Sequence, residues 1–119
     1  MSDRTNSGRF VDTGLITLVS AQALQPLPCN LESTLKSVNS NTPTTIEFFN
    51  DASNPVSIYW LDYSGVRVIY HQLSAGQSYR QSTALTQPWV ITNTAGQCLS
   101  IFLPVQGLGL AKVSSGLLP

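Results

Sequence analysis

Short segments in which apolar and polar residues alternate dominate the chain from residue 44 onward. This period of two residues is typical of β-strands with one buried face. The expected strands cover residues 45–49, 56–61, 66–70, 77–81, 89–92, 98–103 and 108–113. Turn-forming residues separate them, as in residues 51–55 (DASNP) and 63–65 (YSG). The pattern predicts an all-β fold, an antiparallel β-sandwich of about seven strands.

A helical period of 3.6 residues is sustained nowhere in the sequence beyond two turns. Residues 30–36 (NLESTLK) favour one short helix, with Asn30 as its cap.

The first 23 residues differ in character from the rest. Residues 1–13 are polar and aperiodic, so we expect a flexible tail. Residues 14–23 (GLITLVSAQA) have two interpretations: a β-strand, or the apolar region of a signal peptide that ends at Ala21-Gln22-Ala23. We favour the strand, because the apolar run is short and Asp12 precedes it. The chain thus divides into an N-terminal tail or extra strand (1–23) and one sandwich domain (24–119).

The charge balance narrows the range of partners. Six basic and six acidic residues among 119 give a net charge of zero, and only 10% of residues are charged, against about a quarter in an average domain. A neutral surface has little to hold a phosphate backbone or anionic lipid, so we expect neither nucleic acid nor a membrane as partner. One histidine and two cysteines cannot build a four-ligand zinc site, and we expect neither metal nor cofactor.

The two cysteines, Cys29 and Cys98, admit one intrachain pairing. The alternative is two buried thiols in a reducing cytosol. We favour the disulfide, because the Thr/Ser/Asn/Gln-rich strands have an extracellular character. The sequence leaves the compartment open and slightly favours an extracellular or periplasmic one.

No arrangement of residues in the sequence indicates catalysis. A dyad of Cys98 with His71, or a triad of serine, His71 and Asp62, can be drawn, but neither lies in a nucleophile motif. Asp51 and Asp62 stand in turns and are better explained as turn formers. We therefore expect no enzyme activity.

Aromatic residues are concentrated in one part of the chain. Six of them fall between positions 59 and 89: Tyr59, Trp60, Tyr63, Tyr70, Tyr79 and Trp89. They have two interpretations. One is an ordinary sandwich core, and the other is a surface aromatic cage of the kind that grips proline rings or methylated cations.

Several motifs with a joint spacing resemble the von Hippel–Lindau β-domain family over nearly 60 residues. They are SVNS (37–40) followed by Pro43, IEFFN (46–50), YWLDYSG (59–65), the Tyr70…Leu73…Gly76 spacing and Pro88-Trp89. The chain is especially similar to stand-alone domains of that family. The resemblance implies a seven-stranded β-sandwich that binds a peptide through 4-hydroxyproline.

The resemblance also implies the residues of the site. Trp60, Tyr70 and Trp89 match the aromatic walls of the hydroxyproline pocket, and Asn39 matches an asparagine that helps to hold the peptide backbone. Thr83 and Gln87 stand where the family has the serine and histidine that bind the hydroxyl group.

Two further positions depart from the tumour suppressor that names the family. Ser82 replaces a histidine and Ala84 replaces a tyrosine. The walls of the pocket therefore match better than its floor. We include Ser82 and His71, the neighbour of Tyr70, among the expected peptide-binding residues. The tumour suppressor continues into a helical domain that binds elongin C. Residues 105–119 offer no amphipathic helix, so we expect no elongin C partner.

Alternation places Ile58 and Trp60 on one face of their strand and Tyr59 and Leu61 on the other. We expect Tyr59 and Leu61 to supply the core, while Trp60 joins Tyr70 and Trp89 along a surface groove.

We expect Thr83 and Gln87 at the base of this groove. The function expected is a non-catalytic peptide-recognition module for prolyl or 4-hydroxyprolyl segments. The alternative is a structural or interaction β-domain of a larger exported protein, without hydroxyproline binding.

Overall fold

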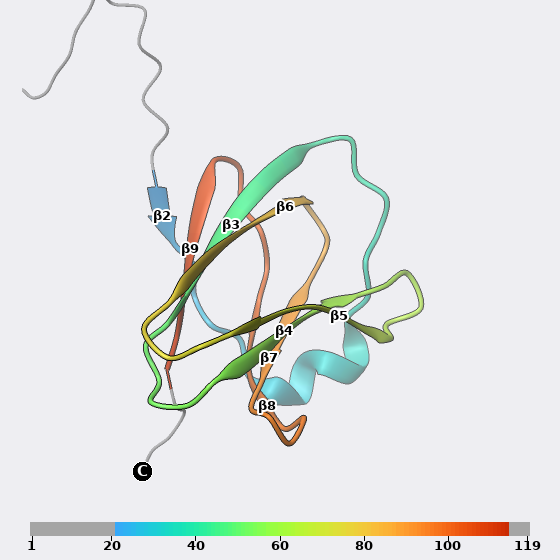
Figure 1. The fold of residues 1–119 in the computed structure, drawn as a ribbon. Coiled ribbons are helices and arrows are strands. Elements are labelled where there is room, and N and C mark those ends of the chain that lie inside the picture. Colours follow the sequence, from blue (N-terminus) through green and yellow to red (C-terminus); the bar gives the residue numbers. More distant parts are fainter. Residues whose placement is uncertain (1–20, 115–119) are drawn as a thin grey trace, which may run out of the picture.

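In the computed structural model, the described part of the chain is residues 21–114. It contains eight β-strands and one short 3₁₀ helix (Figure 1). The elements in chain order are β2 (Ala21–Ala23), η1 (Cys29–Thr34), β3 (Pro43–Asn50), β4 (Val56–Leu61), β5 (Arg67–Leu73), β6 (Ser78–Ala84), β7 (Trp89–Thr92), β8 (Cys98–Phe102) and β9 (Leu108–Val113). The all-β fold predicted from the alternating pattern is confirmed. No helix in residues 21–114 is long and apolar enough to span a bilayer.

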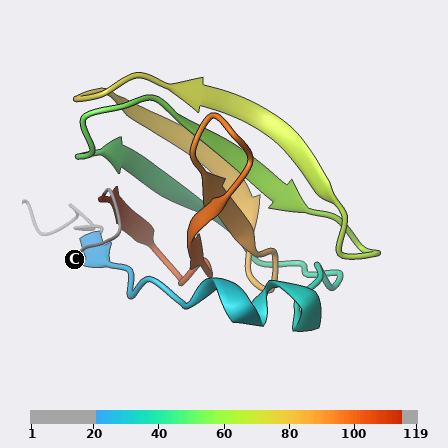
Figure 2. The same cartoon turned by 90° about the horizontal axis from the view of Figure 1, so that it is seen from below.

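The strands form two four-stranded sheets that pack face to face (Figures 1 and 2). The first sheet has the order β2-β9-β3-β6 and the second has the order β5-β4-β7-β8. Most pairs are antiparallel, but β9 runs parallel to both β2 and β3. Alternation did not reveal this, because the direction of β9 is set by the segment that carries the chain from one sheet to the other after β8.

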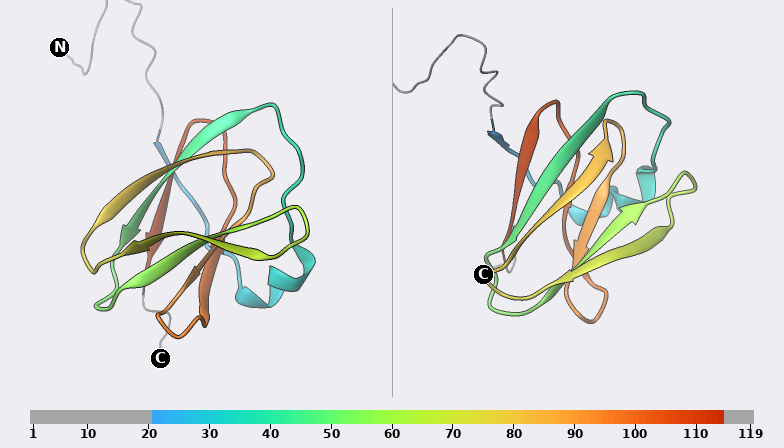
Figure 3. Two further views of the ribbon diagram at one scale, coloured as in Figure 1. Left: turned by 45° about the vertical axis from the view of Figure 1, so that its right-hand side comes forward. Right: turned by 45° about the horizontal axis from the view of Figure 1, so that its top comes forward.

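β5 and β6 are edge strands of different sheets and follow each other in the chain. The turn at Ser74–Gln77 connects them, and in this turn the amide of Gln77 donates to the carbonyl of Ser74. The two strands then diverge, one into each sheet (Figure 3). This side of the sandwich carries the aromatic residues described below.

The main core lies between the sheets. Ile46, Phe48, Ile58, Ile91 and Phe102 are completely buried there, each on the inward face that the two-residue period assigns to it. Burying a side chain of this size contributes about 1.5–3 kcal/mol to folding. These residues explain why the strands pair in these registers.

Both faces of β4 are buried, which corrects the expectation for this strand. Ile58 and Trp60 face the main core, whereas Leu61 belongs to a second cluster with half-buried Tyr59 packed against it. Leu27 and Leu35, on either side of η1, also pack against this second cluster. Leu61 and Tyr59 do pack in a core cluster, as expected. The expectation of an open face at Trp60 was wrong, because alternation within one strand does not tell which face a distant segment will cover.

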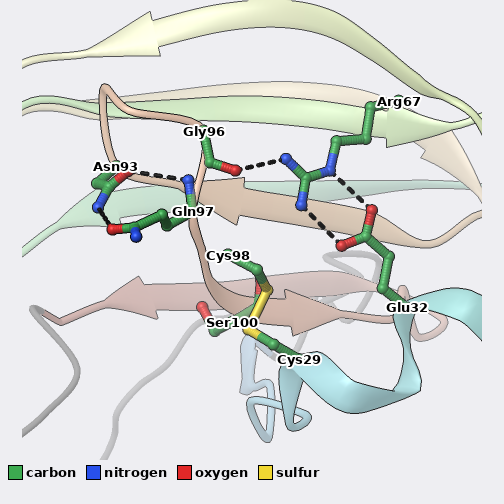
Figure 4. The surroundings of a disulfide bond; sticks show 8 residues. All are labelled: Cys29, Glu32, Arg67, Asn93, Gly96, Gln97, Cys98 and Ser100. Carbon is green, nitrogen blue, oxygen red and sulfur yellow. Dashed lines mark hydrogen bonds and ion pairs between the residues drawn. A yellow bond between two sulfur atoms is a disulfide. The ribbon is translucent and has the colours of Figure 1, made fainter.

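The short helix begins at Cys29 and is a 3₁₀ helix. Pro28 holds the cap position with extended backbone, so Asn30 is not the cap that we expected. The structure joins Cys29 to Cys98 of β8 in a disulfide, with the two Cα atoms 5.9 Å apart (Figure 4). The disulfide holds η1 against the second sheet.

An ion pair also links η1 to the second sheet. The Arg67 guanidinium at the start of β5 donates to both carboxylate oxygens of Glu32 at 2.7 and 2.8 Å and to the Gly96 carbonyl at 2.7 Å (Figure 4). The hydrogen bonds from Arg67 hold the pKa of Glu32 below its usual value. The strand β5, which carries Tyr70, is thereby fixed at its first residue.

The N-terminal segment bridges the other side of the sandwich. β2 pairs with β9 of the first sheet, and Leu27 forms a bridge with Ile101 of the second. Leu24, between them, is buried in the main core. The strand expected at residues 14–23 is present at Ala21–Ala23, and residues 14–20 lie outside the described part of the chain.

Candidate functional site

Four aromatic rings meet near the edge formed by β5 and β6. This aromatic cluster consists of Trp60 on β4, Tyr63 in the turn after it, Tyr70 on β5 and Trp89 on β7. Tyr70 lies edge-to-face against both tryptophans, with ring centroids 6.2 Å from Trp60 and 5.1 Å from Trp89. Tyr63 packs edge-to-face on Trp60 at 5.4 Å. The three rings expected from the resemblance are therefore brought together, and Tyr63 joins them.

The backbone directs Tyr70 into the cluster through a β-bulge. Tyr59 pairs with Ile69 and Ile58 pairs with His71, so Tyr70 is the extra residue between them. A bulge leaves one residue unpaired and re-aims its side chain. Here the bulge places both Tyr70 and His71 on the inner side of β5, which simple alternation would not do.

Exposure rises across the cluster from its floor to its surface. Trp89 is only 1% exposed, Trp60 is half-buried, and Tyr70 and Tyr63 are 46% and 49% exposed. Trp89 also contacts Phe48 of the opposite sheet at 6.0 Å. Trp89 is thus a core residue that forms the floor of the cluster, which corrects the expectation that it lines a surface groove.

The rings lie in mutual contact, and Tyr63 and Tyr70 form the exposed face of the cluster. Centroid distances of 5.1–6.2 Å are those of directly touching rings. A cavity of about 540 Å³ lies outside the cluster, beside Pro43, Arg80 and Leu108, where the start of β3 pairs with the end of β6. A ligand of the aromatic cluster would therefore rest on Tyr63, Trp60 and Tyr70.

A chain of polar side chains runs along the cluster. The Trp89 indole Nε1–H donates to Thr83 Oγ1 at 3.0 Å, and the Thr83 hydroxyl donates to Gln87 Oε1 at 3.4 Å. Gln87 Nε2 donates to the Tyr63 hydroxyl at 3.3 Å. Thr83 and Gln87 are half-buried and lie where the resemblance implies them, next to the aromatic walls.

The loop that carries Gln87 is held in a strained conformation. Thr86 has a φ of +69°, the only positive value at a non-glycine residue in the described part of the chain. A left-handed residue with a Cβ costs about 1–3 kcal/mol, and such residues concentrate at functional sites. Val38 compensates, because its amide donates to the Thr86 carbonyl at 3.1 Å and its carbonyl accepts from the Thr86 hydroxyl at 2.7 Å. Neither Tyr63 nor Thr86 was predicted as a site residue, although Tyr63 is visible in the aromatic-rich segment.

The Trp60 indole carries a further polar group. Its Nε1 is buried and has no hydrogen-bond partner within residues 21–114. Leaving a buried donor unpaired costs about 1–3 kcal/mol, and such groups in native structures call for an explanation. The indole ring that carries this donor packs edge-to-face against both exposed tyrosines of the cluster.

The other predicted site residues lie at the border of the cluster. His71 stacks on Tyr79 of β6 with centroids 3.8 Å apart and so closes the space between the two edge strands. Asn39 is exposed and follows Val38, near the Gln87 loop. Ser82 is exposed and alternates with Thr83, so its side chain points away from the rings.

The residues considered for catalysis are engaged elsewhere. Cys98 is in the disulfide, so it is no nucleophile, and the His71 ring is stacked on Tyr79. Within residues 21–114, no three His, Cys, Asp or Glu side chains gather as a metal site would require.

The sequence pattern of the VHL beta domain matches residues 35–101, more than half of the chain. The chain belongs to the von Hippel–Lindau (VHL) β-domain family. The matched part contains every residue of the aromatic cluster, with Thr83 and Gln87. A comparison with curated proteins gave no match. The VHL β-domain is a protein-binding domain, so this chain carries a domain built for protein–protein interaction.

Proposed function

We propose that this VHL β-domain binds prolyl or 4-hydroxyprolyl peptide segments at the aromatic cluster, without catalysis. The observation that carries the proposal is the position of Tyr70. A bulge directs its ring onto both tryptophans while 46% of the residue stays exposed. A rigid ring held in this way supplies apolar contact area at little cost in conformational entropy.

The shape and chemistry of proline suit this surface. The ring of a proline in an extended segment packs flat against tyrosine and tryptophan, and the segment has little conformational freedom to lose. β5 and β6 are both edge strands, so each has unpaired main-chain groups to which a peptide can add. The prolyl ring would rest on Trp60 and Tyr70 while the peptide backbone follows the strand edge.

Thr83 and Gln87 are the groups available to a hydroxylated ring. Their side chains contact each other at 3.4 Å, which is long for a hydrogen bond between oxygens. A hydroxyl group of the ligand would compete for this weak contact. The same two residues would also tolerate an unmodified ring.

The test is direct binding. Fluorescein-labelled Ala-Ala-Pro-Ala-Ala and its 4-hydroxyprolyl counterpart are titrated with the wild-type chain and with Tyr70→Ala, and anisotropy is recorded. Losing the Tyr70 contact should raise Kd by about 10–100-fold, the range for removing an interface anchor. Leu110→Ala, which truncates a side chain that is 38% exposed on β9, is the matched control and should bind like wild type. Equal affinity of Tyr70→Ala and wild type would remove the site from this surface.

A second function rests on a different observation. Val66, just before β5, and Val68 and Ile69 on β5 are 37–57% exposed, and β5 is an edge strand of its sheet. Exposed apolar edges mark interaction surfaces. They support a structural or interaction domain that packs against another protein, without reading proline. Such a domain would bind neither labelled peptide.

The disulfide bears on the compartment in which the domain works. Disulfides persist in oxidising compartments, and the Cys29–Cys98 bond closes a separation of 69 residues. We propose an extracellular or periplasmic setting for the domain.

A further inference from the structure

The outer edge of β5 gathers most of the exposed apolar surface of the domain. Five of the eight large apolar side chains that are exposed in residues 21–114 lie on β5 or in the turn before it: Tyr63, Val66, Val68, Ile69 and Tyr70. β5 ends its sheet, and no strand among these described residues pairs with its outer side. The bulge disturbs the strand only at Tyr70, so residues 67–69 form a regular edge. A regular apolar edge of this kind marks an interaction surface.

The hydrogen bonds at the start of β5 show which of its main-chain groups point outward. The amide of Asp62 donates to the carbonyl of Val66, so these two residues face each other at the end of the β4–β5 ladder. The next opposite pair is Leu61 and Arg67, and the Leu61 amide donates to the Pro88 carbonyl, on the side of β4 toward β7. Because hydrogen-bonded and non-bonded pairs alternate along an antiparallel ladder, Arg67 turns its N–H and C=O groups away from the sheet.

The same alternation continues through the next two residues. Val68 faces β4, and Ile69 again turns its main-chain groups outward. When two copies of β5 lie antiparallel about a two-fold axis at Val68, Arg67 of each copy stands opposite Ile69 of the other. Both residues of that pair have outward groups, so they can exchange two hydrogen bonds on each side of the axis. The edge is therefore self-complementary, as a two-fold interface requires.

The side chains and their charges also suit this register. Val68 meets Val68 of the second copy, and Ile69, which is 53% exposed, can cover the aliphatic part of Arg67 of the second copy. Arg67 is the only Lys, Arg, Asp or Glu on β5, and its guanidinium is bound to Glu32 of its own chain. Each copy thus brings its own countercharge, and the whole chain has a net charge of zero. Charge therefore does not oppose the association.

We propose that β5 pairs antiparallel with β5 of a second copy of this chain, with the two-fold axis at Val68. The second sheets of the two copies then form one continuous sheet, which buries Val68 and Ile69. The inference gives the second function proposed above its partner. It does not depend on whether the aromatic cluster binds prolyl peptides, because titration of the prolyl probe, the labelled Ala-Ala-Pro-Ala-Ala, tests that function separately.

The register is tested by cross-linking through an introduced cysteine. Opposite residues that do not exchange hydrogen bonds have Cα atoms about 4.5 Å apart, within the range of a disulfide, about 4.4–6.8 Å. Val68→Cys should therefore give a disulfide-linked dimer on mild oxidation, read on a non-reducing gel, since the native cysteines are already joined. Gln72→Cys is the matched control. Gln72 is exposed on the same strand, but its two copies would lie more than about 20 Å apart along the paired strands, so it should give no cross-link.

Association itself is measured by sedimentation equilibrium of the wild-type chain up to about 1 mM. The mass should rise from one chain toward two chains with increasing concentration. Ile69→Lys places an unpaired charge at the interface and should raise the Kd of the dimer at least about tenfold. Leu110→Lys is the matched control, because Leu110 is 38% exposed on β9, which lies between two other strands of the first sheet. It should associate like wild type.

Three results would overturn the inference: a wild-type mass of one chain at every concentration, equal association of Ile69→Lys and wild type, or equal cross-linking of Val68→Cys and Gln72→Cys. The first is also the result expected if another segment of the chain covers this edge. None of the three bears on prolyl binding. Failure of the dimer leaves the proposed peptide binding standing, and failure of the prolyl probe to bind leaves the dimer standing.

Discussion

Replacing Trp89 or Trp60 by alanine should damage different properties of the domain. Trp89 is 1% exposed and packs between Phe48 and Tyr70. Trp60 is half-buried, and its indole nitrogen has no partner in the described part of the chain. We expect Trp89→Ala to reduce the free energy of unfolding and Trp60→Ala to reduce mainly the affinity for peptide.

The expected magnitudes follow from burial. Removing a fully buried tryptophan costs about 3–5 kcal/mol, a large part of the roughly 5–15 kcal/mol that stabilises a domain. At about 4 °C per kcal/mol for a chain of this size, the melting temperature should fall by about 15 °C. Trp60→Ala also removes an unsatisfied buried donor, which offsets part of the lost packing. We expect it to cost about 1–2 kcal/mol of stability and to raise Kd for the prolyl probe by about 10–100-fold.

The assay is urea unfolding followed by far-ultraviolet circular dichroism, since tryptophan fluorescence would change with each variant. Trp89→Phe serves as the control: it keeps most of the apolar volume and should recover more than half of the lost stability. The reasoning would be refuted if Trp60→Ala destabilised the fold as much as Trp89→Ala, because both tryptophans would then be equivalent core residues.

Two predictions concern the contacts that fix η1. Replacing Cys29 and Cys98 together by alanine should lower the free energy of unfolding by about 2–4 kcal/mol, because the disulfide, which spans a separation of 69 residues, restricts the unfolded chain. Titration of free thiols in the unfolded wild-type protein, without reductant, should find none. Two free thiols per chain would contradict the disulfide. The lowered pKa of Glu32 means that its ion pair with Arg67 stabilises the fold above a pH of about 4.5 and that this stabilisation is lost as the pH falls through the pKa of the folded state. Glu32→Gln should therefore lower the free energy of unfolding, measured in urea titrations, by about 1 kcal/mol near pH 7 and by less at pH 3. A loss of stability that is the same at both pH values would show that the ion pair contributes nothing.

The strands and their turns could be predicted from the sequence because they depend on local chemistry. Each of the seven expected segments from residue 45 onward overlaps a strand. The turn after β4 illustrates why. Gly65 adopts a φ of +80°, which glycine reaches without strain, and the Asp62 carboxylate accepts from the amides of Ser64 and Val66. Both features lie within five residues of each other and are visible in the sequence.

The composition of the site was predicted only in part. The rings of Trp60, Tyr70 and Trp89 do meet, but the depth of each ring depends on the opposite sheet. Phe48 lies 41 positions before Trp89 in the sequence and covers its ring from the first sheet. Nothing in the segment around Trp89 reveals that contact, so its burial could not be predicted from the strand alone.

The sequence by itself determined the strands, the turns and the family, because alternation, turn residues and motif spacing are properties of neighbouring positions. Only the tertiary structure decided which faces are buried, where the bulge directs Tyr70, and that Tyr63 hydrogen-bonds to Gln87. Those outcomes depend on segments that are distant in the chain and become neighbours when the sheets pack. A half-exposed ring and a hydrogen bond across two loops leave no periodic trace in the sequence, because they arise from the packing of the whole domain.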